Sequence, residues 1–237
     1  MKKLLVVGLV LALLMPSYAF CEPVGTGYAV GSIFVFGAYE QDNDLSNGKE
    51  PIEWIILDVN EDGSLVLLSK YALDCKPYNT KFTEVTWETC TLRKWMNEEF
   101  YNSAFSPQER VKIMSVTLDN EDNPNNGTTG GKPTTDKLWL LSMNEVADYF
   151  TSDRVYSYFT DDTSRMCAPT KYAANRGAFQ SSDSMVDGAG ACQWWLRSPG
   201  DYSGCASYVN ASGIVGISGW DVDSEDFSIR PVICVLP

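Results

Sequence analysis

The chain has 237 residues, of which 44% are hydrophobic, 12% aromatic and 21% charged. It therefore has enough apolar material for a sizeable core and is neither a disordered nor a fibrous chain. Acidic residues outnumber basic ones by 31 to 18, and the formal net charge of −13 opposes contact with a phosphate backbone, so we expect no nucleic-acid partner. The sequence contains no histidine, which excludes Ser-His-Asp and Cys-His catalysis and histidine-bearing zinc sites.

The first residues have the pattern of a secretory signal peptide. Lys2 and Lys3 precede a short apolar run over residues 4–14, and a small-x-small cleavage pattern ends at Ala19. We predict a signal peptide over 1–19, a tether over 20–30 and a single domain over 31–237, in a secreted or cell-surface protein. No second apolar stretch predicts a transmembrane span in the mature chain. Lipid anchoring at Cys21, near the cleavage site, is the alternative to free secretion.

Six further cysteines form an even set in a chain that is expected to be exported, which indicates disulfide bonds. Zinc is the rival interpretation, but the sequence has no Cys-x-x-Cys pair and no histidine to complete a mixed site. Spacing does not choose among the many pairings that six cysteines allow. The working guess is Cys75–Cys90, Cys167–Cys192 and Cys205–Cys234.

The first predicted elements are strands. An apolar stretch at 33–36 indicates one strand. Residues 53–59 and 65–69 are rich in Ile, Leu and Val and flank a turn that contains Asp62-Gly63. This pattern predicts a β-hairpin.

The middle of the chain has helix signals. Apolar residues at three- and four-residue spacing predict a helix that begins near Thr89, namely Leu92, Trp95, Met96 and Phe100. Capping patterns at residues 106–109 and 142–145 predict two further helix starts, and the second is followed by an apolar face up to Phe150. We also predict a strand over 137–141 and a helix over 169–177.

The remaining segments are a polar loop and a β-rich end. Residues 119–136 lack periodicity and indicate a surface loop. Short apolar runs separated by turn residues predict the last strands, at 194–197, 205–209, 214–217 and 229–236. A hairpin, then helices, then a β-rich end favours one α+β domain.

Several motifs occur in order between Gly31 and Leu236. The most specific are Trp-Trp-Leu-Arg-Ser-Pro-Gly at 194–200 and Ile-Arg-Pro-Val at 229–232, joined by the segments at 78–79, 86–95 and 135–142. Together they resemble an uncharacterised family of bacterial exported and cell-surface proteins, a domain of unknown function. More distantly, the order of the patterns is similar to the C-type-lectin-like fold, which includes the sulfatase-modifying-factor (formylglycine-generating) domains.

The resemblance implies an α+β, C-type-lectin-like fold, with twisted antiparallel sheets and a few packed helices. That fold often serves as a rigid platform for variable binding loops. The formylglycine-generating enzymes hold copper with a cysteine pair, and no such pair is mapped onto this sequence.

Four residues of the two motifs are expected to be structural. Trp194 and Trp195 are expected in the core, because aromatic burial dominates the energetics of a small domain. Arg197 and Arg230 lie among apolar strand residues, and buried arginines are normally paired. The candidate partners were acids near the C-terminus: Asp201, Asp221, Asp223 and Asp226.

Two acidic segments offer hard oxygen ligands to calcium. The candidates are Asp119 and Asp122 in the polar loop, and Asp221 and Asp223 near the C-terminus. Neither segment has the EF-hand spacing. A solvated acidic loop without a cation is the favoured interpretation of both, so no cofactor is expected, with calcium as the exception.

The candidate ligand contacts are aromatic residues among Gly, Ser and Asn in the C-terminal turns: Tyr202, Tyr208 and Trp220, with Asp201 beside them. This mixture suits stacking on sugars or peptides, although packing between turns is an equal alternative. The sequence thus predicts an exported, non-enzymatic domain that binds a glycan or a protein at the cell surface. The alternative function is that of a formylglycine-generating-like oxidase or another enzyme on the same scaffold.

Overall fold

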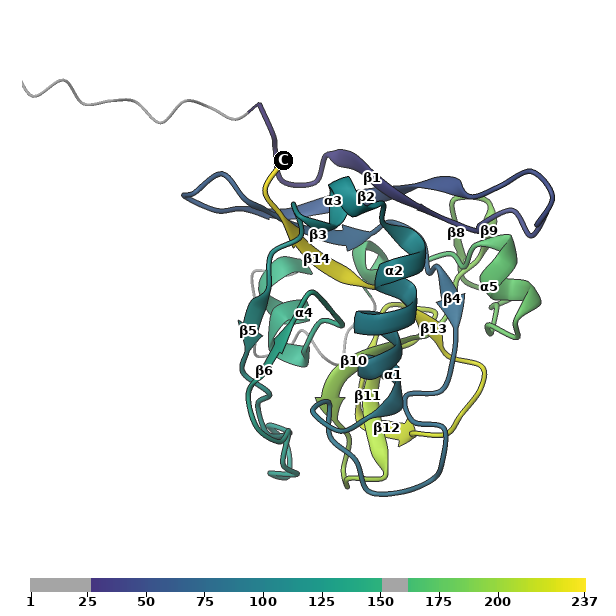
Figure 1. The fold of residues 1–237 in the computed structure, drawn as a ribbon. Helices are drawn as coiled ribbons and strands as arrows, with labels where there is room; N and C mark the ends of the chain where they lie inside the picture. Colours follow the sequence, from purple (N-terminus) through teal and green to yellow (C-terminus); the bar gives the residue numbers. More distant parts are fainter. Residues whose placement is uncertain (1–26, 151–161) are drawn as a thin grey trace, which may run out of the picture.

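The structure is a computed structural model that describes residues 27–150 and 162–237. The predicted signal peptide, Cys21 and most of the predicted tether lie outside the described residues. In the described part of the chain, every helix is too short or too polar to cross a membrane. The architecture is mixed α+β, and its largest elements are two five-stranded sheets (Figure 1).

The first sheet lies at the top of Figure 1, and all its neighbouring strands are antiparallel. Its order is β1 (Ile33–Tyr39), β2 (Glu50–Val59), β3 (Leu65–Ser69), β14 (Val232–Val235) and β7 (Leu138–Trp139). Ile52, Trp54 and Ile56 of β2 point inward with the period of two that one buried face requires. The hairpin predicted from its Asp-Gly turn is confirmed as β2 and β3.

The second sheet lies at the bottom of Figure 1. Its order is β12 (Val215–Asp221), β11 (Cys205–Val209), β10 (Trp194–Pro199), β13 (Ser228–Ile229) and β4 (Asp74–Cys75). Only the β10–β13 pair is parallel among these neighbours. Every residue of β10 is buried, so the predicted 194–197 strand forms the centre of this sheet. Two small hairpins complete the β structure: β5 (Val116–Leu118) with β6 (Thr134–Asp136), and β8 (Met185–Val186) with β9 (Ala189–Gly190).

The helical segments are short. Their bounds are α1 (Thr91–Trp95), η1 (Met96–Phe100), α2 (Tyr101–Ala104), α3 (Pro107–Arg110), α4 (Met143–Phe150), η2 (Thr163–Arg165) and α5 (Lys171–Asn175). The first three follow one another without a break, with a π-helical centre, and bury the predicted apolar face through Leu92, Met96 and Phe100. Cys90 is the N-cap, one residue after the predicted start.

One hydrophobic core joins the two sheets, because a single cluster of buried residues extends from Phe36 to Val235. Trp54, Trp87, Trp194 and Trp195 are among its largest fully buried side chains. Trp194 and Trp195 of β10 are therefore core residues, as predicted. Buried aromatic rings of this size supply much of the apolar area that stabilises such a domain.

Two predicted elements differ from the structure. Residues 134–136, expected within a surface loop, form β6 and pair with 116–118. The strand expected over 229–236 is interrupted at Arg230 and Pro231, so that β13 belongs to the second sheet and β14 to the first. Proline has no N–H for a ladder hydrogen bond, and the carbonyl of Pro231 instead accepts from the N–H of Ser69 at 3.0 Å.

Candidate functional site

A cleft of about 360 Å³ lies beside α4. One side consists of α4 and Ser142, and another consists of β5 and residues 119–121, which lie next to α4 in Figure 1. The buried lining residues include Trp139 of β7, Arg197 of β10 and Cys234 of β14. We call this the α4 cleft. Its volume is within the range of small-molecule sites, about 300–1,000 Å³.

Local sequence fixes the start of α4 and with it one carboxylate of the cleft. The hydroxyl of Ser142 accepts from the N–H of Glu145 at 3.1 Å, and the Glu145 carboxylate accepts from the N–H of Ser142 at 2.9 Å. This is the predicted capping box, which satisfies two donors at the helix start. Because its carboxylate is held by the cap, Glu145 has a defined position on the side of the cleft.

Arg197 is the only basic residue among the described residues that line the cleft. Its guanidinium forms an ion pair with Glu145. Nη1 also donates to the carbonyl of Leu140 at 3.0 Å, and Nη2 donates to the carbonyl of Asp119 at 3.3 Å. Arg197 thus connects β10 to both sides of the cleft.

Two N–H groups of the cleft residues lack an acceptor. Trp139 and Arg197 are 3% and 5% exposed, and neither Trp139 Nε1 nor Arg197 Nε has a hydrogen-bond partner among the described residues. A buried donor without a partner costs about 1–3 kcal/mol. Both atoms are closed off from solvent, so an oxygen acceptor on a ligand would recover that free energy only if the lining of the cleft opened to admit it.

The opening of the cleft is acidic. Asp119, Glu121 and Asp148 are exposed lining residues, and the Glu121 carboxylate accepts from Asn144 Nδ2 at 2.5 Å. Carboxylates accept hydrogen bonds and repel anions. The cleft therefore has exposed acceptors among its lining residues, and two of its buried lining residues have N–H groups without a partner.

Two titratable side chains of the cleft are neutral at ordinary pH. Burial raises the pKa of Tyr149 to about 12, and the negative charge of Glu145 adds to this effect. Burial also raises the pKa of the Cys234 thiol. Because the thiolate is the reactive form of cysteine, Cys234 is not an activated nucleophile here.

The structure places the sequence-predicted ligand residues elsewhere. Trp220 is exposed in β12 of the second sheet and Tyr202 is exposed just before β11, whereas Tyr208 packs edge-on against Phe227 with ring centroids 5.1 Å apart. Asp201 is held by the polar loop, since Asn126 Nδ2 donates to its carboxylate at 2.9 Å. None of the four predicted residues lines the α4 cleft.

The predicted calcium ligands are not gathered into one group. Asp122 accepts from the N–H of Gly130 at 3.0 Å, and Asp221 accepts from the hydroxyl of Tyr202 at 3.1 Å. Of the predicted ligands, Asp119 alone lines the α4 cleft, and Asp223 is exposed. Within the described residues, the group whose geometry suits a metal ion is instead Glu40, Asp42 and Glu50, which the sequence analysis missed.

The arginine partners also differ from those expected. Arg197 pairs with Glu145 and not with an acid near the C-terminus, because β10 passes beside the start of α4. Arg230 is 1% exposed, donates from Nε to the carbonyl of Ser69 at 3.0 Å and lies over the ring of Trp194 at 5.1 Å. Its contacts are with the protein interior, in keeping with a structural role.

The six described cysteines are buried and are free thiols in this structure. Cys167 and Cys192 are neighbours: their side chains are hydrogen-bonded, and the N–H of Cys192 donates to the carbonyl of Cys167 at 2.8 Å. The other expected pairs are not brought together. Cys75 and Cys90 belong to separate buried clusters. Cys205 and Cys234 lie in β11 and β14, which belong to different sheets at opposite ends of Figure 1.

Comparisons with known proteins identify a family but no relative of known activity. No curated protein and no solved structure matches the chain. A family model described as Domain of unknown function (DUF6273) matches residues 62–237, which is more than half of the chain. That range includes every residue that lines the α4 cleft except Asn60, whereas Glu40, Asp42 and Glu50 precede it. The chain therefore belongs to the DUF6273 family of domains of unknown function.

Proposed function

We propose that the protein is a non-enzymatic binding module that recognises a polyhydroxylated ligand, a glycan, in the α4 cleft. The observation that carries the proposal is the pair of buried N–H groups, Trp139 Nε1 and Arg197 Nε, that have no acceptor within the described residues. Sugar hydroxyl oxygens are suitable acceptors for such groups.

The arrangement of charge favours a neutral polyol over other ligand classes. A hydroxyl both donates and accepts, so one ligand could donate to the carboxylates of Asp119, Glu121 and Asp148 and, if the lining opened on binding, accept from the buried N–H groups. An anionic ligand would be repelled by those carboxylates. The aromatic ring of Tyr149 also lines the cleft and provides apolar surface for the C–H face of a sugar.

The setting of this module is part of the proposal. Export to the cell surface is supported by the N-terminal charged and apolar pattern of residues 1–19. The C-type-lectin-like assignment is supported by the order of the sequence motifs and by the mixed α+β architecture with mainly antiparallel sheets. In such a molecule the two sheets are a rigid scaffold, and recognition belongs to the segments at its edges.

Thiol-based oxidase chemistry is the weaker interpretation of the same cleft. It requires two reactive thiols beside one hollow, and Cys234 is the single cysteine among the described lining residues. The raised pKa of Cys234 keeps that thiol protonated at neutral pH. The cleft therefore favours binding over thiol chemistry.

A glycan array with the wild-type protein, followed by calorimetric titration of the glycan that binds, tests the proposal. Trp139→Phe keeps an aromatic ring and removes the Nε1–H, so we expect affinity to fall about 2- to 12-fold, the value of one hydrogen bond. The matched control is Trp220→Phe at an exposed tryptophan outside the cleft, which should leave affinity unchanged. No bound glycan, a loss confined to the control, or release of cleaved sugar would each contradict the proposal.

A further inference from the structure

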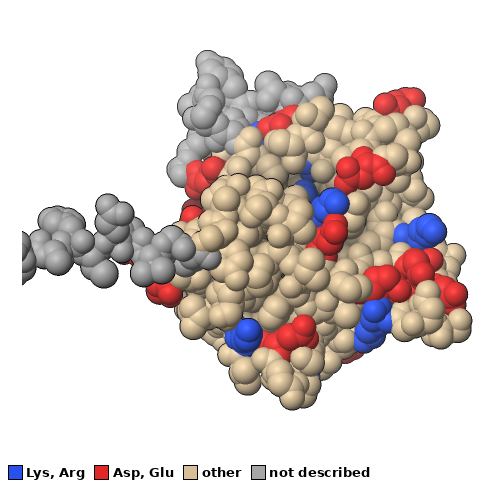
Figure 2. Space-filling model, turned by 90° about the horizontal axis from the view of Figure 1, so that it is seen from above, with Lys and Arg blue, Asp and Glu red and all other residues tan. Residues whose placement is uncertain are grey.

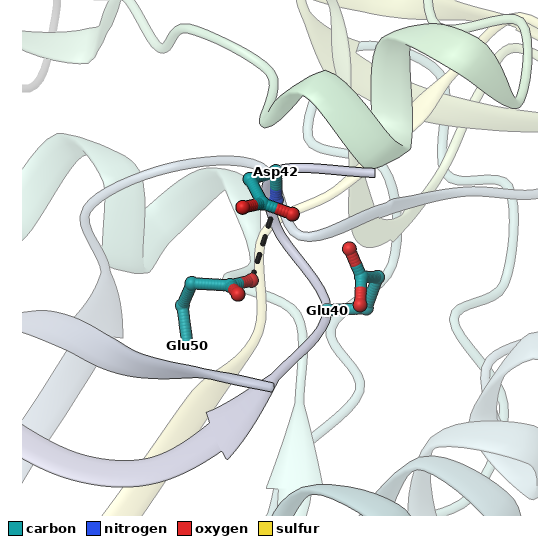
Figure 3. A group of neighbouring side chains, drawn as sticks. All are labelled: Glu40, Asp42 and Glu50. Carbon is teal, nitrogen blue, oxygen red and sulfur yellow. Dashed lines mark hydrogen bonds between the residues drawn. The ribbon is translucent and has the colours of Figure 1, made fainter. Parts of the chain in front are cut away.

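A second candidate site lies in the loop between β1 and β2, residues 40–49, which with Glu50 we call the acidic loop. Glu40 directly follows β1, and Glu50 is the first residue of β2, paired in register with Tyr39. Asp42 lies two residues after Glu40. One carboxylate oxygen from each residue lies within 4.8 Å of the others, and the three side chains face a common space in Figure 3.

Glu40 is unusual among these acids because it is buried. The residue is 7% exposed, and its Oε1 has no hydrogen-bond partner among the described residues. Burying an ionised carboxylate is costly unless it is paired or coordinates a metal. One carboxylate oxygen of Glu40 belongs to the set of three that lie within 4.8 Å of one another, so this buried carboxylate adds an unmet demand for positive charge beside Asp42 and Glu50.

The positive charge of Lys171 helps to lower the pKa of the Asp42 carboxyl, but in the described part of the chain no basic side chain forms an ion pair with the three acids. On the face seen from above, acidic side chains gather toward the right of the view, with basic side chains next to them (Figure 2). Three carboxylates this close repel one another in the absence of a cation.

Backbone and side-chain donors hold the carboxylates in place. Glu50 Oε2 accepts from the N–H of Gln41 at 2.7 Å and from the N–H of Asp42 at 3.3 Å (Figure 3). Asn47 Nδ2 donates to Asp42 Oδ2 at 2.8 Å. The loop is anchored to α5, because the N–H of Tyr172 donates to the carbonyl of Gln41 at 3.1 Å. A cation would therefore meet ligands that are already oriented.

We propose that Glu40, Asp42 and Glu50 bind one calcium ion. The ligands are all carboxylate oxygens, which suit hard cations and not zinc or copper. Calcium–oxygen distances of about 2.3–2.6 Å allow oxygens up to roughly 5 Å apart to share one ion, and the observed limit is 4.8 Å. Asp42 and Glu50 are half-buried, which leaves an open side for the waters that complete the flexible calcium shell.

Calcium binding would fix the loop that joins β1 to β2. All three ligands come from a short segment of chain that joins β1 to β2, and the same segment contacts α5 through Gln41. The ion would neutralise the buried Glu40 and fix the loop against the edge of the first sheet. This site is independent of the α4 cleft, and its test does not require a glycan.

The experiment is a calorimetric titration of the EDTA-treated protein with CaCl₂, alongside thermal unfolding with and without the ion. We expect saturable binding of one ion per chain, with Kd between about 10⁻⁶ and 10⁻³ M, and an increase in Tm. Glu40→Gln should weaken binding at least 10-fold and abolish the increase in Tm. In EDTA, the same variant should be more stable than the wild type, because it removes the buried unpaired charge.

Glu61→Gln is the matched control, since Glu61 is an exposed acid in the turn of the next hairpin, and it should bind calcium like the wild type. If Glu40→Gln folds poorly, Asp42→Asn repeats the test at a ligand that is only half-buried. Binding that is absent, equal in Glu40→Gln and the wild type, or tighter for Mg²⁺ than for Ca²⁺ would overturn the proposal.

Discussion

The α4 cleft and the acidic loop both contain buried polar atoms without a hydrogen-bond partner, but the atoms have opposite character. In the cleft they are donors, Trp139 Nε1 and Arg197 Nε, whereas in the loop the atom is an acceptor, Glu40 Oε1. Unsatisfied donors select a ligand with oxygen atoms, and an unsatisfied ionised acceptor selects a cation. The kind of unmatched atom, more than the size of a hollow, therefore indicates the ligand class.

The two sites also differ in how the chain builds them. The acidic loop is local, because its three carboxylates lie within eleven consecutive residues, 40–50. The cleft is assembled from distant segments: Glu145 and Arg197 are 52 residues apart, and β14 is inserted between β3 and β7. A local site depends on its own loop, and an assembled site depends on the whole fold.

The largest expected effect concerns the connection between the two regions. Cys167 precedes α5, which contacts the acidic loop, and Cys192 precedes β10, which carries Arg197. We predict that oxidation joins these neighbouring cysteines and stabilises the fold by about 3–4 kcal/mol, the value for a closed loop of about 25 residues. Peptide mapping of unreduced protein should find this link, and denaturant unfolding with and without reductant should give the difference in free energy.

Cys75→Ser is the control for that link, because Cys75 has no cysteine neighbour in its buried cluster and the serine variant should keep the full effect of reductant. Recovery of Cys167 and Cys192 as alkylated thiols from unreduced, unfolded protein would contradict the prediction.

The next largest expected effect is a loss of stability on substitution in the α4 cleft, the site that is assembled from distant segments. Glu145→Ala removes the partner of the buried Arg197 guanidinium and one half of the capping box. Loss of one partner from a buried ion pair costs about 3–5 kcal/mol, and partial exposure of Glu145 places the expected loss of unfolding free energy near 3 kcal/mol by urea denaturation. The exposed Glu121→Ala in the same cleft should cost less than about 0.5 kcal/mol. Equal effects of the two substitutions would show that the Arg197 pair does not support the cleft.

The elements that the sequence predicted well are those with local signals. The Asp-Gly turn produced the β2–β3 hairpin, and the Ser-x-x-Glu boxes at 106–109 and 142–145 both form their reciprocal hydrogen bonds. The change from one sheet to the other at Pro231 was not predicted, because an apolar run does not reveal that its two halves join different sheets.

The candidate sites were harder to predict for two different reasons. No spacing rule connects Glu145 to Arg197, since their contact depends on non-local packing of α4 against β10. The acidic loop did have a signal, with acids at both ends of a hairpin loop, but these acids do not have the EF-hand spacing that is typical of calcium loops. A rule based on strand register would have placed Glu50 beside Tyr39 and Glu40.

A smaller effect appears at alkaline pH, where Tyr149 is the tyrosine of the cleft whose pKa is raised. The folded-state pKa of Tyr149 is about 12, above the value near 10 of a free tyrosine. The unfolded chain therefore loses its proton first, so the stabilising contribution is complete below about pH 10 and is lost as pH rises toward 12. Tyr149→Phe should flatten this part of the stability curve by up to ~1.4 kcal/mol per pH unit, measured by urea denaturation at successive pH values. An unchanged slope would show that Tyr149 is not buried against the cleft in solution.

The smallest expected effect is the coupling between the two sites. No described residue belongs to both the cleft lining and the acidic group, and substitutions at separate sites without shared partners add within about 0.5 kcal/mol. Trp139→Phe should therefore leave calcium affinity unchanged, and Glu40→Gln should leave glycan affinity unchanged. In calorimetric titrations, the double variant should lose as much calcium affinity as Glu40→Gln alone and as much glycan affinity as Trp139→Phe alone. Calcium could instead control glycan binding through α5 and the first sheet. In that case glycan affinity would fall in EDTA for the wild type but not for Glu40→Gln, and the two regions would have to be treated as one site.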